Sequence, residues 1–402
     1  MKLFQQFGRV TSGGRFIPVV DGLRCVAILG VILYHLEDYL THKGVAWNPE
    51  SAVESATHRL LHAGFVGVPL FFALSGFILA LPFFESAFGA RSGRPTDLKR
   101  YYLRRVTRLE PPYLINLLIA SLLLMIVNGA PWRDLLPHFA ASAFYVHNQV
   151  YGEMSTINPV AWSLEIEVQF YLIAPWLARG LIALSPAVRR TILLASLAAL
   201  VSAKGVYGRY PPQVAMSLLG TIDHFLAGIL LADVYVTDWK SNPGKGPGWD
   251  LVSLAVWPAI FAAPGRGGWV SCLPLLTIIA YVAAFRGRWS SRLFSWTPAV
   301  LIGGMCYSIY LYHFFVISAV SRVTLPEPSR VGYLASVALQ TLLIVPAVIV
   351  SCAILFRLFE RPFMAWRPWR SAGRRSNDVI PYVAAGGFGA GDVSFAGGEG
   401  ER

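Results

Sequence analysis

The sequence has 402 residues, of which 55% are hydrophobic and only 14% are charged, and its formal net charge is +12. Soluble domains carry about 25% charged residues. This shortage, together with a mean hydropathy of +0.53, excludes an ordinary soluble protein and predicts a membrane protein. The positive residues fall in short clusters between apolar runs. Because this is how membrane proteins set their orientation, we expect no nucleic-acid partner.

Membrane-crossing helices need about 20 mostly apolar residues. The sequence therefore predicts an all-α polytopic membrane helix bundle of about ten transmembrane helices. They are expected at 17–36, 64–84, 111–129, 158–178, 191–207, 212–236, 251–263, 269–285, 299–321 and 332–359. Most lysines and arginines fall in the loops on the side of the N-terminus, so the positive-inside rule predicts that both termini are cytoplasmic. A bacterial inner membrane is the expected location.

This reading divides the chain into three parts. Residues 1–16 form a cytoplasmic N-terminus, 17–363 a transmembrane domain, and 364–402 a cytoplasmic tail rich in glycine, where we expect disorder. The first apolar stretch contains charges and lacks a small-residue cleavage site, so it is predicted to be a span and not a cleaved signal peptide. The four cysteines lack metal-ligand spacing, and no metal site is expected.

The first predicted span contains three ionisable residues, Asp21, Arg24 and His35. Each charged group inside a span costs roughly 2.5–3.5 kcal/mol on insertion scales, so such groups usually face a partner or a cavity. Arg24 and His35 share one helix face, about 16 Å apart along the axis, and Asp21 can pair with Arg24. This arrangement suits a reaction between an anionic donor on one side and an acceptor on the other, with His35 as the base. Asp21 and Arg24 could instead be a packing pair, and His35 a satisfied interfacial histidine.

Six short motifs follow one another along the chain. They are Pro18 to Arg24 with His35 eleven residues on, Phe71 to Phe77, Arg104 to Tyr113, Trp162 to Tyr171, Tyr307 to His313, and Phe359 to Pro362. In this order the sequence resembles the acyltransferase-3 family of membrane O-acyltransferases. One departure is Cys306, which stands where serine is common.

The resemblance implies an acyltransferase that moves an acyl group, with acetyl expected, from cytoplasmic acyl-coenzyme A to a hydroxyl of an envelope glycan. A lipid-linked sugar or a small hydroxylated molecule could also be the acceptor. No permanently bound cofactor is expected, and membrane lipid surrounds the bundle. Some relatives carry a further hydrolase-like domain, so we expect any second transfer step to need a partner.

The basic run before the third predicted span is the candidate donor site. Arg104 and Arg108 share a helix face, and Arg105 lies beside them. Together with Arg24 they could bind the phosphates of acyl-coenzyme A through charge-assisted, often bidentate contacts. The simpler alternative is a topology anchor under the positive-inside rule.

The fourth predicted span places Ser163, Glu167 and Tyr171 on one stripe, while Glu165 points elsewhere. We expect the stripe to face the polar interior, with Glu167 as a third catalytic residue that pairs with Arg24 or orients His35. A purely structural ion pair is the alternative.

Further polar residues could line the acceptor path. Asp223 and His224 form an ionisable pair in the sixth predicted span, and Tyr310 and His313 lie in the ninth. Packing or interfacial hydration would explain them equally well. Ser75 and Gly76 are predicted to form a small-residue helix contact, and Glu360 an ion pair that closes the last helix.

A transporter or flippase is the rival function, in which Arg24, His35 and Glu167 line a substrate or proton path. Transporters often show two similar halves and helices broken by glycine or proline. The sequence shows no such internal symmetry, which favours the enzyme.

Overall fold

The computed structural model describes residues 16–89, 92–93, 96–207, 211–262, 267–325 and 331–366. Within these ranges the regular elements are helices, with a single isolated β-bridge. The predicted all-α class is therefore confirmed. Nearly all of the predicted N-terminal segment and tail lies outside the described residues.

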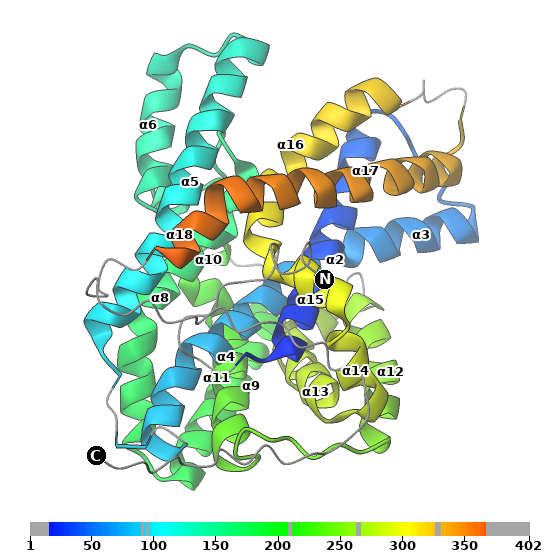
Figure 1. Cartoon of the computed structure of the whole chain (residues 1–402). Coiled ribbons are helices and arrows are strands. Elements are labelled where there is room, and N and C mark those ends of the chain that lie inside the picture. Colours follow the sequence, from blue (N-terminus) through cyan, green and yellow to red (C-terminus); the bar gives the residue numbers. More distant parts are fainter. Residues whose placement is uncertain are drawn as a thin grey trace, which may run out of the picture.

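The helices follow one another as shown in Figure 1. In the first half they are α2 (Pro18–His42), α3 (Ala52–His62), η1 (Ala63–Val66), α4 (Gly67–Phe88), α5 (Leu98–Asn128), α6 (Trp132–Ala143), α7 (His147–Tyr151), η2 (Pro159–Ala161), α8 (Trp162–Ile182) and α9 (Pro186–Tyr207). In the second half they are α10 (Pro212–Ala215), α11 (Leu218–Thr237), α12 (Gly248–Ala262), η3 (Gly267–Cys272), α13 (Leu273–Arg286), α14 (Arg288–Phe294), α15 (Thr297–Gly304), α16 (Cys306–Thr324), α17 (Tyr333–Leu355), the π-turn η4 (Phe356–Glu360) and α18 (Arg361–Ala365).

Seven helical segments in the described part of the chain are long and apolar enough to cross a membrane. They are Pro18–His42, Ala52–Phe88, Leu98–Asn128, Pro186–Lys204, Gln213–Thr237, Trp269–Arg286 and Tyr333–Ala365. The count becomes eight if the bent pair α15 and α16 is one span. The chain is thus a polytopic helix bundle, and the count of ten with cytoplasmic termini stays a prediction.

Three of the ten predicted segments differ from simple spans. Segment 158–178 forms α8, whose first half carries two glutamates and a glutamine and is too polar to qualify. Segment 251–263 forms α12, which has only 15 residues. Segment 299–321 was expected to be one helix, but it breaks at Met305 into α15 and α16, which are bent by 76°. Two glycines, Gly303 and Gly304, precede this break and weaken the helix there.

Helix α2 runs through the middle of the molecule and packs against α4, α14, α15 and α16. Its first turns are in close backbone contact with α15, because any Cβ at Gly303 would overlap the carbonyl oxygen of Asp21. Small residues at helix contacts let backbones approach in this way. The carboxylate of Asp21 and the guanidinium of Arg24 are consequently held in a tightly packed region.

Helices α4 and α11 form the most extensive helix pair. Gly76 of α4 meets the backbone of Phe225, and Gly228 of α11 meets the backbone of Ala73, each without room for a Cβ. The predicted small-residue contact at Gly76 is confirmed. The ring of Phe225 also stacks on Phe170 of α8 at 4.0 Å between centroids, so the apolar core joins all three helices.

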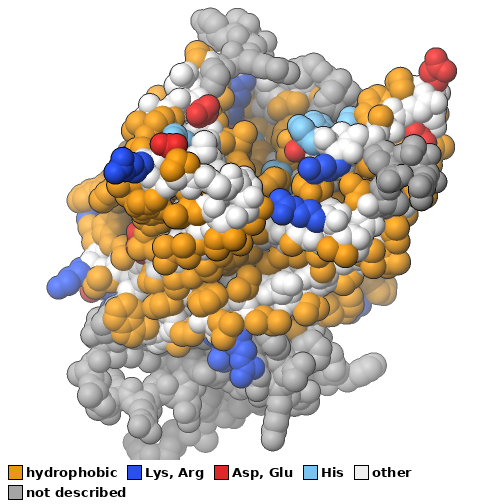
Figure 2. All heavy atoms as spheres, turned by 90° about the horizontal axis from the view of Figure 1, so that it is seen from above, with side chains coloured by type: hydrophobic (Ala, Val, Ile, Leu, Met, Phe, Trp, Pro, Cys, Tyr) orange, Lys and Arg blue, Asp and Glu red, His pale blue; other side chains and the backbone are white. Residues whose placement is uncertain are grey.

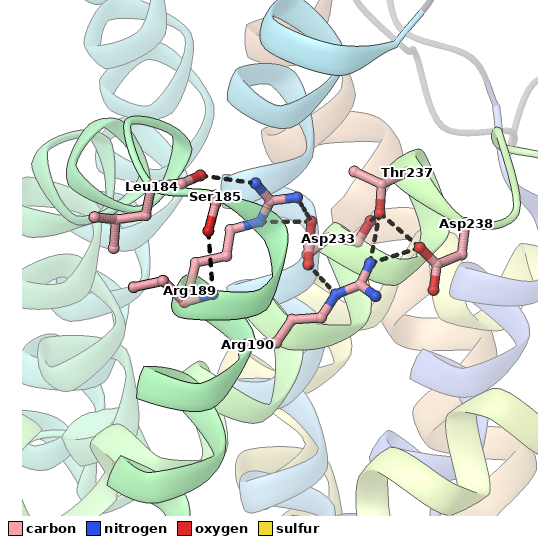
Figure 3. Close-up of polar contacts among 8 residues, drawn as sticks. Leu184, Ser185, Arg189, Arg190, Asp233, Thr237 and Asp238 are labelled. Atoms are coloured by element: carbon pink, nitrogen blue, oxygen red, sulfur yellow. Dashed lines mark hydrogen bonds and ion pairs between the residues drawn. The ribbon is translucent and has the colours of Figure 1, made fainter.

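A buried charge cluster fixes α9 to α11 (Figure 3). Asp233 accepts hydrogen bonds from both Arg189 and Arg190, at 2.9 Å from Arg189 Nε and 2.7 Å from Arg190 Nε. Arg190 also donates to Asp238 at 2.6 Å and to Thr237 at 2.7 Å. Arg189 and Asp233 are fully buried, so each charge depends on the other for compensation.

Candidate active site

Arg24 lies in a buried polar cluster at the first turns of α2. Its Nη1 donates to Asp21 Oδ1 at 2.6 Å, and both residues are buried. The predicted pairing of Arg24 with Asp21 is therefore present, within a single helix.

Glu167 is bound by hydroxyl groups from two elements. Ser75 of α4 donates to its Oε1, and Tyr171 donates to the same oxygen at 2.6 Å. Among the described residues, no ion pair joins Glu167 to Arg24 and no contact joins it to His35, so both predicted roles of Glu167 stay predictions.

The stripe on α8 continues to α16 through Ser163. Its hydroxyl is 2.8 Å from the hydroxyl of Tyr310, which in turn donates to the carbonyl of Val160. Ser163, Glu167 and Tyr171 therefore face neighbouring helices, as their spacing predicts. Glu165 points to α7 and accepts from the backbone of Asn148 at 2.9 Å.

His35 lies nearer the other end of α2, where it is partly exposed. Its ring lies 5.1 Å from that of His313, 4.9 Å from Tyr34 and 5.8 Å from Phe314, between centroids. Figure 2 looks at the molecule from the end where α6 and α16 lie, and shows histidine side chains at the rim of a hollow. Because His35 is partly exposed, an acceptor could reach its imidazole from outside the bundle.

Three of the four predicted donor-binding arginines, Arg104, Arg105 and Arg108, lie within about one turn of α5, whereas Arg24 lies in α2. Arg105 stacks on the Tyr101 ring, with Cζ 3.4 Å from its centroid, and lies 5.8 Å from the Tyr171 ring. Arg108 approaches Glu360 at 4.0 Å, which confirms the predicted ion pair of the last helix. Arg104 is partly exposed on the same helix.

Arg105 and Arg108 each have a buried N–H group that makes no hydrogen bond to the described residues. The Nε atoms of Arg105 and Arg108 are buried and have no hydrogen-bond partner in the described part of the chain. Unmade hydrogen bonds of buried donors are costly. The cluster borders the Glu167 group, because Arg105 lies 5.8 Å from the Tyr171 ring and Tyr171 donates to Glu167.

Asp223 and His224 lie apart from this chain of contacts. Lys204 of α9 donates to both carboxylate oxygens of Asp223, at 2.8 and 2.7 Å. This ion pair joins α9 to α11 and accounts for Asp223 structurally. A place for either residue on the acceptor path stays a prediction.

Sequence reasoning missed a polar cluster around Glu37, a carboxylate that is almost fully buried. His58 of α3 lies 2.7 Å from it through Nδ1, and Tyr333 of α17 donates to it at 3.3 Å. Trp47 stacks on His58 at 4.5 Å. The available signal was the position of Glu37, two residues after His35 at the end of a predicted span.

No group of three or more metal-ligating side chains that could hold a metal ion occurs among the described residues.

Comparison with known proteins matches residues 17–357 to the acyltransferase-3 family, described as an acyltransferase domain. One relative, named "Putative O-acetyltransferase", from Staphylococcus aureus strain COL, is 25% identical over 88% of this chain and 59% of its own length. The peptidoglycan O-acetyltransferase OatA of Listeria monocytogenes strain EGD-e is 26% identical over 87% of this chain and 56% of its own.

The O-acetyltransferase OatA of Staphylococcus aureus strain NCTC 8325 is 26% identical over 75% of this chain and 51% of its own length. The chain thus spans between half and three fifths of the length of these curated relatives. No solved structure matches it. Because the family match covers most of the sequence and includes the helices that carry the site, the chain belongs to the acyltransferase-3 family of membrane acyltransferases.

Proposed function

We propose that the chain transfers an acyl group, with acetyl favoured, from acyl-coenzyme A to a hydroxyl of an envelope glycan. One observation carries the proposal. Arg24, in its buried pair with Asp21, and the partly exposed His35 lie on a single helix, α2. Ser163 of α8 bonds with Tyr310 of α16, and α16 also carries His313 beside His35. The relatives named as O-acetyltransferases support acetyl as the group transferred.

The donor would bind at the arginines of α5. The unpartnered Nε atoms of Arg105 and Arg108 support a site for phosphate oxygens, which arginine binds through paired N–H groups. Arg104 would add charge at the partly exposed edge. Arg24 would then hold the donor from inside the bundle, and the acyl end would reach towards His35, about 16 Å farther along α2.

The acceptor hydroxyl would approach His35 from its partly exposed side. Its oxygen forms the bond to the acyl carbon, the carbon–sulfur bond breaks, and His35 takes the hydroxyl proton, which ends on the coenzyme A thiolate. A transient acyl-histidine is the alternative order of steps. Peptidoglycan, a lipid-linked sugar and a small hydroxylated molecule are all compatible acceptors, and the Listeria relative favours the first.

The proposed orientation follows from the positive charges of the loops. Donor binding at the basic end of α5 places that end in the cytoplasm. Ten spans with both termini cytoplasmic, in a bacterial inner membrane, agree with this assignment. Acyl groups would then pass from inside to outside along α2.

One observation favours a transporter as the second candidate. The 76° break between α15 and α16 is the kind of interrupted helix that transporters use at a binding site. A transporter would move a substrate without forming an ester, so the two candidates differ in their products.

The deciding experiment uses inside-out and right-side-out vesicles with labelled acetyl-coenzyme A and a peptidoglycan fragment as acceptor. We expect labelled O-acetyl ester in the wild type, and loss of ester in His35→Ala and Arg24→Ala with normal membrane insertion. Ser92→Ala, in an exposed turn, serves as the matched control. Ester formation that is undiminished in His35→Ala would reject the histidine base, and label that crosses without ester would favour the transporter.

A further inference from the structure

The imidazole beside His35 has a defined tautomer. His313 lies in α16 and is fully buried. Its Nδ1 is 2.9 Å from the carbonyl oxygen of Ile309 and 2.8 Å from that of Tyr310. Carbonyl oxygens only accept hydrogen bonds, so Nδ1 carries the hydrogen and Nε2 is the acceptor.

That acceptor has no partner. Nε2 of His313 is buried and makes no hydrogen bond within the described part of the chain. Leaving a buried acceptor unsatisfied costs about 1–3 kcal/mol, so the atom is expected to serve a group that reaches it during function.

Two rings lie next to His313, and only one of them can supply a hydrogen. The Tyr310 ring lies 6.4 Å away, but its hydroxyl already bonds with Ser163 and Val160. The His35 ring lies closer, at 5.1 Å and tilted by 44°. His35 is only partly buried, so its ring has room to rotate towards Nε2.

We propose that His313 is the positioning residue of His35. Its Nε2 accepts the hydrogen on one ring nitrogen of His35, which holds the other nitrogen deprotonated towards the acceptor hydroxyl. A carboxylate often orients a catalytic histidine in this way, but Glu167 is occupied by Ser75 and Tyr171 here. The proposal rests on the proposed transfer reaction.

The proton balance of the reaction is unchanged by this role. His35 takes the hydroxyl proton as the ester bond forms and the thioester carbon–sulfur bond breaks, and later passes it to the thiolate. While His35 is protonated, the hydrogen bond to His313 spreads its positive charge over two rings. His313 neither touches the acyl group nor gains a covalent bond.

Two substitutions test the roles of the two ring nitrogens of His313 separately. In His313→Asn the amide can keep the hydrogen bonds to Ile309 and Tyr310, but nothing replaces Nε2. In His313→Gln the longer amide places an acceptor near the position of Nε2. We expect His313→Asn to lower kcat by about 100-fold with KM for acetyl-coenzyme A unchanged, and His313→Gln to recover activity to within about tenfold of the wild type.

The assay uses protein in nanodiscs with acetyl-coenzyme A and a peptidoglycan fragment, and includes the double variant His35→Ala/His313→Asn. Because His313 acts through His35, the double variant should be no slower than His35→Ala alone. Losses that multiply, or full activity in His313→Asn, would overturn the proposal. If His35→Ala is inactive and His313→Asn is active, only this inference fails; if His35→Ala is active, the proposed base fails as well.

A spectroscopic readout decides the case if His313→Asn does not fold. Nitrogen-15 NMR of histidine-labelled wild type should show an N–H···N bond between His35 and His313, assigned through its loss in His35→Ala. Two unbonded rings in the wild type would contradict the positioning role.

Discussion

The charge cluster between α9 and α11 allows a quantitative test of the fold. Asp233 is fully buried and compensates Arg189, which is also fully buried. Asp233→Asn removes the negative charge and turns an amide N–H₂ towards guanidinium donors. Breaking one side of a buried ion pair costs about 3–5 kcal/mol, because the remaining charge stays uncompensated. We therefore expect Asp233→Asn to lower the free energy of unfolding by about 3–5 kcal/mol.

The same cluster supplies the control. Asp238 also bonds to Arg190, but its side chain is 47% exposed. Exposed pairs contribute about 0–1 kcal/mol, so Asp238→Asn should stay within that range. Both variants would be unfolded in detergent by a denaturant series and followed by tryptophan fluorescence. Equal effects, or a larger loss in Asp238→Asn, would refute the reasoning from burial.

Three further predictions concern packing, the site and pH. Gly228→Ala should separate α11 from α4 and destabilise the protein by about 1–3 kcal/mol, whereas Gly180→Ala has open space and should be neutral or slightly stabilising, as thermal unfolding would show. Tyr171→Phe removes one of two hydroxyls from Glu167 and should lower kcat/KM by less than about tenfold in the acetyl-transfer assay. A hydrogen bond from Arg190 lowers the pKa of Asp238 below its usual 3.8. The contribution of Asp238 to the free energy of unfolding is therefore complete above about pH 4 and is lost as pH falls through the lower, folded-state pKa. Wild type and Asp238→Asn should therefore differ in melting temperature at neutral pH and converge in strong acid.

Helical periodicity predicted several features of the site correctly. It placed Asp21 against Arg24 and put Ser163, Glu167 and Tyr171 on an inward stripe. These relations lie within one helix, where the spacing of residues fixes which side chains share a face. The small-residue contact at Gly76 was predicted from residue size instead, because a glycine lets two helix backbones approach closely.

Relations between helices could not be read from the sequence. Ser75 donates to Glu167 across 92 positions, and Lys204 satisfies Asp223 from a neighbouring helix. Apolar length alone also gave no sign of the break at Met305, because the residues on both sides of it are apolar. Pairing of this kind depends on helix packing, which a pattern in one segment does not contain.

Glu360 shows how late in biosynthesis the surroundings of Arg108 and of the start of α16 are completed. This fully buried carboxylate lies in the π-turn η4, accepts from the backbone and hydroxyl of Ser308 at 3.1 and 2.6 Å, and faces Arg108. During translation, α5 and α16 leave the ribosome before residue 360 is made. Until the last helix inserts, the start of α16 lacks its cap and Arg108 lacks its counterion, so the nascent protein cannot yet have the arrangement of the proposed donor site.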